Sequence, residues 1–123
     1  MAAPNIIGAT TINGKTTGVD LPTTNETTVL NNPASSGKCL KINTLNVANY
    51  SSTTANITIN FHTASNIGGT AIPIIGNISV PGNATLNVVD KTSQYYLEED
   101  TSIGAVASLS SKFAVTVSYE EIS

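Results

Sequence analysis

Few residues in this chain are able to do chemistry, and the acidic ones are the most concentrated. Glu98-Glu99-Asp100 form one compact group and Glu120-Glu121 form another near the C-terminus. Paired carboxylates can catalyse glycoside hydrolysis or bind Ca²⁺. However, the chain has no Trp on which a sugar could stack, and its acids lack the alternating spacing of a calcium loop. We interpret both groups as solvated acids at turns, and a sugar-acting enzyme that uses 98–100 is the rival hypothesis.

His62 and Cys39 are the single residues of their types. A zinc site would need carboxylates as further ligands, and a serine-hydrolase triad would need His62 as its base without any Gly-x-Ser-x-Gly motif. His62 follows the run 57–61 and points away from Phe61, which predicts an exposed imidazole. Cys39 has no partner for an internal disulfide, and its alternating neighbours predict an inert, partly buried thiol. We therefore expect no catalytic residue, no metal ligand and no cofactor.

The rest of the composition is that of a polar surface with little charge. Thr, Asn and Ser supply 45 of the 123 residues, and the net charge is only −3. Because there is no Arg and no basic cluster, nucleic-acid binding is not expected. The densest apolar run, 71–75, is far shorter than the roughly 20 residues of a membrane-spanning helix, so no membrane insertion is expected. Low charge instead permits association with copies of the chain or with another protein.

Period-two alternation of apolar and polar residues recurs along the chain and predicts β-strands. The expected strands cover 27–31, 38–49, 57–61, 72–80, 84–88, 103–107 and 113–119. Pro73 and Gly76 indicate an edge position or a bulge for the strand that contains them. With turn signals between the runs, about eight short strands predict an all-β fold, a single antiparallel β-sandwich. We favour a jelly-roll-like order, and an immunoglobulin-like sandwich is the alternative, because periodicity does not reveal strand order.

The strand expected over 38–49 changes phase in its middle. Its first half has Leu40 and Ile42 on one face, whereas the apolar residues of its second half stand at odd-numbered positions. A shift of one residue would turn the second half inside out. We therefore predict a β-bulge at Asn43-Thr44 that keeps both halves facing the core.

The first 22 residues differ from the remainder, so we divide the chain into an N-terminal arm, 1–22, and a β-sandwich domain, 23–123. Asn13-Gly14 is a type I′ hairpin signal, but its flanks offer little to bury. We expect the arm to pack on a neighbouring subunit or partner, with Asn5, Ile6 and Ile7 at the interface. The N-terminus lacks the basic and apolar regions of a signal peptide, which together with a single Cys indicates synthesis in a reducing cytosol.

Tyr95 and Tyr96 are the other candidate interface residues. Because they are adjacent, a strand would turn one ring inward and the other outward. The outward ring is either an anchor for a partner or a cover for the rim of the sandwich.

Five segments carry a resemblance to a known class of proteins: MAAPNI (1–6), GKCLKIN (37–43), VPGNATL (80–86), YLEEDTSI (96–103) and VSYEEIS (117–123). Together they resemble small virion structural proteins of tailed bacteriophages, particularly those of marine cyanobacteria. The resemblance extends over nearly the whole chain and brings no catalytic residues. It implies a non-enzymatic part of the virion, made in the cytoplasm of the host bacterium.

Within that class, the resemblance implies a capsid decoration (cement) protein that binds the outer surface of the phage head and stabilises it. It further implies a homo-oligomer, with a trimer favoured, whose partners are the major capsid protein or other virion proteins. The alternative is a neck, tail or fibre-base component, or a host-glycan-binding β-sandwich of the virion. The chain has no internal repeat and no stalk, which favours the capsid.

Overall fold

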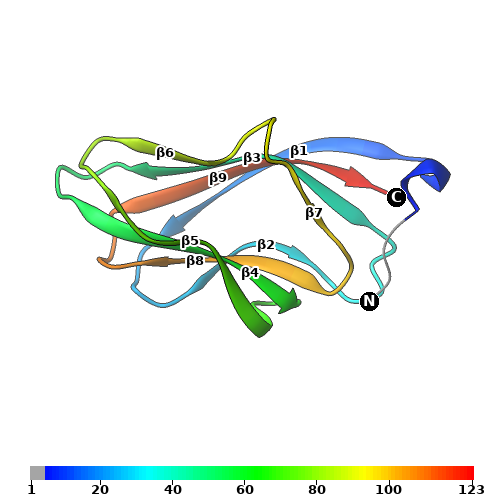
Figure 1. Cartoon of the computed structure of the whole chain (residues 1–123), viewed down its shortest axis with the longest axis horizontal. Helices are drawn as coiled ribbons and strands as arrows, with labels where there is room; N and C mark the ends of the chain where they lie inside the picture. Colours follow the sequence, from blue (N-terminus) through cyan, green and yellow to red (C-terminus); the bar gives the residue numbers. More distant parts are fainter. Residues whose placement is uncertain (1–4) are drawn as a thin grey trace.

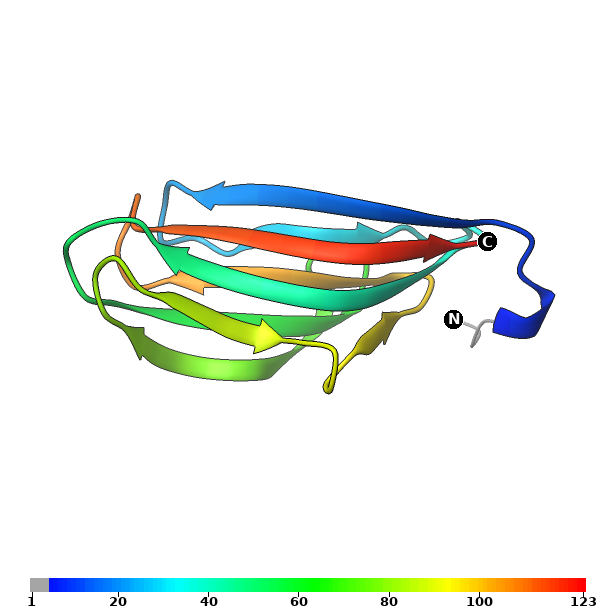
Figure 2. The same ribbon diagram turned by 90° about the horizontal axis from the view of Figure 1, so that it is seen from above.

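The structure, a computed structural model, describes residues 5–123 and consists of two antiparallel β-sheets packed face to face (Figure 1; Figure 2). The elements are the short 3₁₀ helix η1 (Ile6–Gly8) and the strands β1 (Ile12–Leu21), β2 (Thr27–Asn32), β3 (Cys39–Asn49), β4 (Ala55–Ala64), β5 (Gly68–Val80), β6 (Thr85–Val89), β7 (Tyr95–Leu97), β8 (Thr101–Ala107) and β9 (Phe113–Ile122). One sheet has the order β1-β9-β3-β6, with β7 also paired to β3, and the other has the order β2-β8-β4-β5. No helix among these residues is long and apolar enough to cross a membrane.

The strand order is that of a jelly roll. The pairs are nested around the β4–β5 hairpin: β3 pairs with β6 and β7, β2 with β8, and β1 with β9. Such nested pairs, divided between two sheets, form the two Greek keys of this fold. The predicted all-β sandwich is therefore confirmed, and of the two orders considered the structure has the jelly-roll one.

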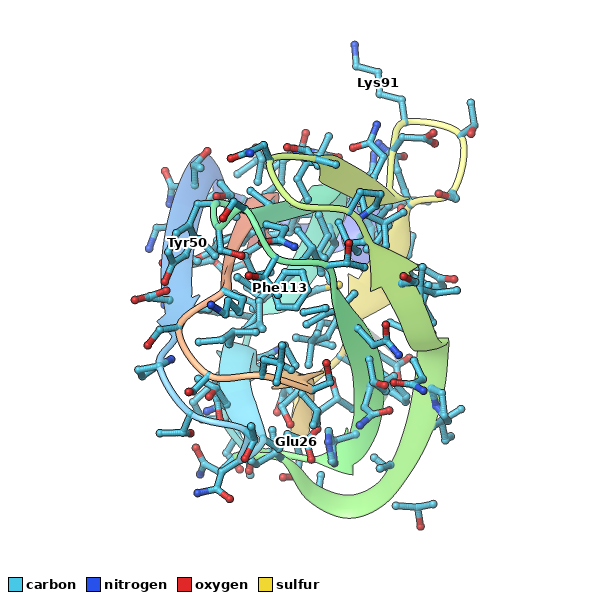
Figure 3. The ribbon with its side chains drawn as sticks, turned by 90° about the vertical axis from the view of Figure 1, so that its left-hand side faces the viewer. Glu26, Tyr50, Lys91 and Phe113 are labelled. Atoms are coloured by element: carbon cyan, nitrogen blue, oxygen red, sulfur yellow. The ribbon has the colours of Figure 1, made fainter. Side chains whose placement is uncertain are left out.

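The core lies between the sheets and is built from the alternating apolar residues of both. Phe113 at the start of β9 is fully buried and lies between the two layers (Figure 3). Other fully buried side chains are Leu21, Ile42, Leu45, Val47, Ile57, Ile59, Val89, Leu97, Ile103, Val115 and Val117. The pleat turns the intervening Thr, Asn and Ser residues outward, which explains how a chain with so little charge still has a polar surface.

The β-bulge predicted at Asn43-Thr44 is confirmed. The register of β3 against β9 shifts between Ile42 and Thr44. Leu40 and Leu45, on either side of the shift, are both buried. The extra residue thus keeps both halves of β3 facing the core.

The structure corrects our interpretation of the N-terminal segment. The type I′ hairpin signal at Asn13-Gly14 does not correspond to a turn, because both residues lie inside β1 and neither has the positive φ that such a turn requires. All of β1 pairs with β9, and Leu21 is buried in the core, so this part of the segment 1–22 belongs to the sandwich. Strand β9 supplies hydrogen-bond partners for the backbone of β1, and the small and polar side chains of β1 do not prevent this pairing. Within the segment 1–22, the described residues 5–9, which include η1, lie outside the sheets and near the end of β9 (Figure 1).

β5 lies at the edge of its sheet, as the sequence indicated. Its pairing with β4 shifts register three times, and Pro73 lies within it. Proline and bulges are typical of edge strands because an edge needs only half of its backbone groups for the ladder.

Candidate functional site

The candidate site is an apolar groove at the open side of the sandwich, between the edge strand β5 and the short strand β7. Its volume is about 370 Å³. It is lined by Phe61, Ile72, Pro73, Ile74, Tyr95, Tyr96, Leu97 and Ile103. Because β7 is only three residues long and β5 is irregular, the two sheets do not close over each other here. The groove consequently opens onto Leu97 and Ile103, which belong to the buried core.

Tyr95 and Tyr96 both line this groove. Tyr95 is paired with the core residue Ile42, and Tyr96 is paired with Lys41, so the two rings leave opposite faces of β7 as the alternation predicted. The inward direction of Tyr95 does not bury it. The two side chains are 44% and 48% exposed, because both line a groove that is open to solvent.

The N-terminal candidates lie elsewhere. Asn5 and Ile6 line a smaller hollow of about 230 Å³ beside Cys39 and Ile122, and this hollow shares no lining residue with the groove. Ile7 projects into solvent and is 98% exposed. The structure therefore does not bring the N-terminal residues and the tyrosines together within one molecule.

Cys39 is more buried than the sequence indicated. The thiol is free and lies inside the protein. Burial raises the pKa of the Cys39 thiol, and the negative charge of Glu98 adds to the effect. A thiol held in its protonated form is a poor nucleophile, so the inert reading of this residue agrees with its surroundings.

His62 departs from the sequence-based prediction of an exposed imidazole, which is wrong. The side chain does point to the outer face of its sheet, yet the residue is only 3% exposed. Its Nε2 lies 2.6 Å from Glu26 Oε2, and its Nδ1 lies 3.2 Å from the carbonyl oxygen of Gly68. Asn60 Nδ2 donates to the same Glu26 oxygen at 3.1 Å. With both ring nitrogens facing acceptors, the imidazole has no free nitrogen to serve as a catalytic base.

Gly104 provides the room for this polar cluster. A Cβ at this position would collide with Glu26 Oε2 and with an Ile67 methyl group, so only glycine lets both side chains lie flat on the sheet between β2 and β4. The neighbouring Ser102 hydroxyl donates to the Ala64 carbonyl and accepts from the Ile67 amide, both at 2.8 Å. These bonds hold the β4–β5 turn over the outer face and bury His62. The signal in the sequence is a glycine at an outward position of a strand, which marks a close approach of another group.

The acidic groups serve structure at two different places. Glu98-Glu99-Asp100 form the turn between β7 and β8, as interpreted from the sequence. Asp100 accepts hydrogen bonds from the Ser65 amide and hydroxyl, which lower the pKa of the Asp100 carboxyl. The arrangement joins this turn to the β4–β5 turn.

Glu120 and Glu121 lie in strand β9, which corrects the interpretation of this pair as turn acids. Glu121 forms ion pairs with Lys15 at 3.1 Å and Lys38 at 3.2 Å, and the hydrogen bond from Lys15 is the main cause of its lowered pKa. Among residues 5–123, no group of three or more His, Cys, Asp or Glu side chains is placed to hold a metal ion.

Comparisons with known proteins bear on the fold. No protein-family model and no curated protein matches this sequence. Among solved structures, a similar chain comes from work described as "Bacillus endospore appendages form a novel family of disulfide-linked pili". The match has a TM-score of 0.55 and 10% sequence identity, and it covers 100% of this chain and 96% of that chain. At this identity the similarity supports the fold alone.

Proposed function

We propose that this protein is a non-enzymatic structural subunit of a virion, which works by binding other protein subunits. The observation that carries the proposal is the groove between β5 and β7. It opens onto the core and is flanked by the half-exposed side chains of Ile72, Tyr95 and Tyr96. Clustered apolar exposure of this kind is typical of a protein interaction site, and Tyr is enriched in such sites.

The finer part of the proposal is that the protein decorates the capsid. The resemblance of the sequence to virion proteins of tailed phages supports it, and the fold is one that a solved pilus structure also uses. A decoration protein that binds only the assembled shell stabilises that shell by mass action. In this proposal the groove receives an apolar side chain of the major capsid protein, and the exposed Ile7 adds a second contact.

The groove is tested by the binding of purified protein to capsids that lack it. Tyr95→Ala removes a ring from the groove wall, and Tyr50→Ala is the matched control. Tyr50 follows β3 at the end of the sandwich away from β7, and it is 51% exposed (Figure 3). Loss of a central interface tyrosine costs about 2 kcal/mol, so we expect about 30-fold weaker binding for Tyr95→Ala and little change for the control.

Equal binding by the two tyrosine variants would overturn the role of the groove. Ile7→Ser tests the N-terminal contact in the same assay, and binding as tight as that of the wild type would overturn it. The number of copies per particle tests the location. Hundreds of copies support decoration, whereas a single ring of subunits would place the protein at the neck or tail.

A further inference from the structure

The free edge of β1 is unlike the other sheet edges of this molecule. Natural β-proteins protect their edges with proline, bulges, very short strands or charged side chains, especially Lys. β5 has Pro73 and three register shifts, β2 has a shift within six residues, and β6 and β7 are five and three residues long. β1 pairs with β9 over ten consecutive residues without a shift and contains no proline, and its single Lys is bound to Glu121 of β9. Among the described residues, no strand pairs with its other side.

The backbone groups on this edge can be assigned from the pairing with β9. Thr11 and Ser123 exchange both of their backbone hydrogen bonds, at 2.9 Å each. In an antiparallel ladder such pairs alternate with pairs that exchange none, so the odd-numbered residues of β1 bond to β9. The even-numbered residues therefore turn their N–H and C=O groups outward. These residues are Ile12, Gly14, Thr16, Gly18 and Asp20.

We infer that β1 is an interface, and that its occupant is β1 of a second copy of this chain, paired antiparallel about a two-fold axis. The inference deepens the proposed function, because it names one of the partners of the structural subunit. The pairing would join two β1-β9-β3-β6 sheets into one continuous sheet.

The strand is suited to pair with itself. The outward-facing residues are symmetric about Thr16, so a two-fold axis at Thr16 places Gly14 opposite Gly18 of the second copy and leaves none of them unpaired. The two glycines lack side chains that could hold the second sheet away, and Gly14 has open space around it. The strand carries one Lys and one Asp, so two copies bring no net charge together. Lys15 is already bound to Glu121 of its own chain.

A disulfide at the axis tests the register directly. In the proposed dimer the Cα atoms of the two Thr16 residues are about 5.5 Å apart, within the range of about 4.4–6.8 Å that a disulfide spans. Thr16→Cys should therefore give a covalent dimer under a mild oxidant. Thr116→Cys is the matched control, because Thr116 is exposed on β9 opposite Gly18, one strand further from the axis. Cross-linking of both variants to the same extent would overturn the inference.

A pair of proline variants tests the edge without relying on cysteine chemistry. Thr16→Pro removes an N–H that points outward, so we expect the dissociation constant of the dimer to rise about 30-fold. At concentrations where both proteins are monomeric, the fold and the melting temperature should be kept. Thr17→Pro removes an N–H bonded to β9 and should lower the melting temperature instead. Sedimentation velocity and thermal melts measure both. Equal loss of stability in the two variants would overturn the assignment of outward groups.

The mass of the wild-type assembly in solution tests this inference separately from the proposed function. The resemblance to virion proteins implies a trimer, whereas pairing of β1 about a two-fold axis predicts a dimer. A trimer, or a monomer at every concentration, would overturn the β1 interface and leave the groove to be judged by the Tyr95 variant. Normal capsid binding by Tyr95→Ala, together with cross-linking through Thr16→Cys, would overturn the groove and support the β1 interface.

Discussion

The substitution Glu26→Ala should destabilise this protein more than any other loss of an acidic side chain. The Glu26 carboxylate accepts hydrogen bonds on the outer face of one sheet, where it lies against Asn60 and His62. Both partners are buried, and the carboxylate itself is partly exposed. Truncation would leave Asn60 Nδ2 and His62 Nε2 without their acceptor. Buried polar atoms that have lost both water and their protein partner destabilise the fold.

The magnitude follows from the two groups left unpaired. Each buried donor without an acceptor costs about 1–3 kcal/mol, and water entering the space left by Glu26 reduces the sum to about 2–4 kcal/mol. Unfolding entropy is about 2.1 cal/mol/K per residue, or about 0.26 kcal/mol/K for a chain of this length. We therefore expect the melting temperature to fall by about 8–15 °C.

The assay is thermal unfolding followed by circular dichroism, with Glu120→Ala as the control. Glu120 lies in β9, and no hydrogen bond or ion pair of its carboxylate is seen among the described residues. Its truncation should shift the melting temperature by about 2 °C or less. Hydrogen exchange adds a local readout, because the amide of Ile67 should lose protection when the turn over His62 loosens. A melting temperature for Glu26→Ala equal to that of Glu120→Ala would show that the Glu26 carboxylate does not stabilise Asn60 and His62.

Three further results are expected. Gly104→Ala should destabilise the wild type more than it destabilises the Glu26→Ala variant, because the new Cβ collides with both the Glu26 carboxylate and an Ile67 methyl group, and Glu26→Ala removes only the first collision. Equal losses measured in a double-mutant cycle would contradict this. Because the pKa of Asp100 is lowered on folding by hydrogen bonds from Ser65, its stabilisation is complete above about pH 4 and is lost as the pH falls through the folded value. The melting temperature of Asp100→Asn, measured from neutral to acid pH, should therefore fall less steeply in acid than that of the wild type. Burial raises the pKa of Cys39, so a thiol reagent should modify it far faster in denaturant than in buffer; equal rates would show that the thiol is accessible.

Alternation made much of this fold predictable. A strand with one buried face must repeat its apolar residues every second position, so Phe113 and its neighbours could be assigned to the core from the sequence. The phase change within β3 was equally informative, because a half-buried strand can change phase only through an extra residue. The bulge at Asn43-Thr44 followed from that constraint alone.

β1 and His62 were misjudged for a shared physical reason. The side chains of β1 are small and polar, and the strand is held by backbone hydrogen bonds to β9, which leave no mark on the pattern of side chains. His62 was assigned correctly to the outer face, but its cover comes from Glu26 and from a turn that follows in the chain. Only the strand order brings these segments together, and period-two alternation does not contain that order.

The two proposed surfaces have a consequence together that neither has alone. β1 and β7 lie at opposite edges of the same sheet, with β9 and β3 between them. A dimer joined through β1 therefore carries its two grooves at the far edges of one continuous sheet, and no groove residue is used in the joint. Two grooves held at a fixed separation convert the second binding event into an intramolecular one, which strengthens attachment to a repeating lattice without any new contact. For this reason Thr16→Pro should weaken attachment to capsids although it changes nothing in the groove, and it should leave the binding of a single capsid subunit unaltered.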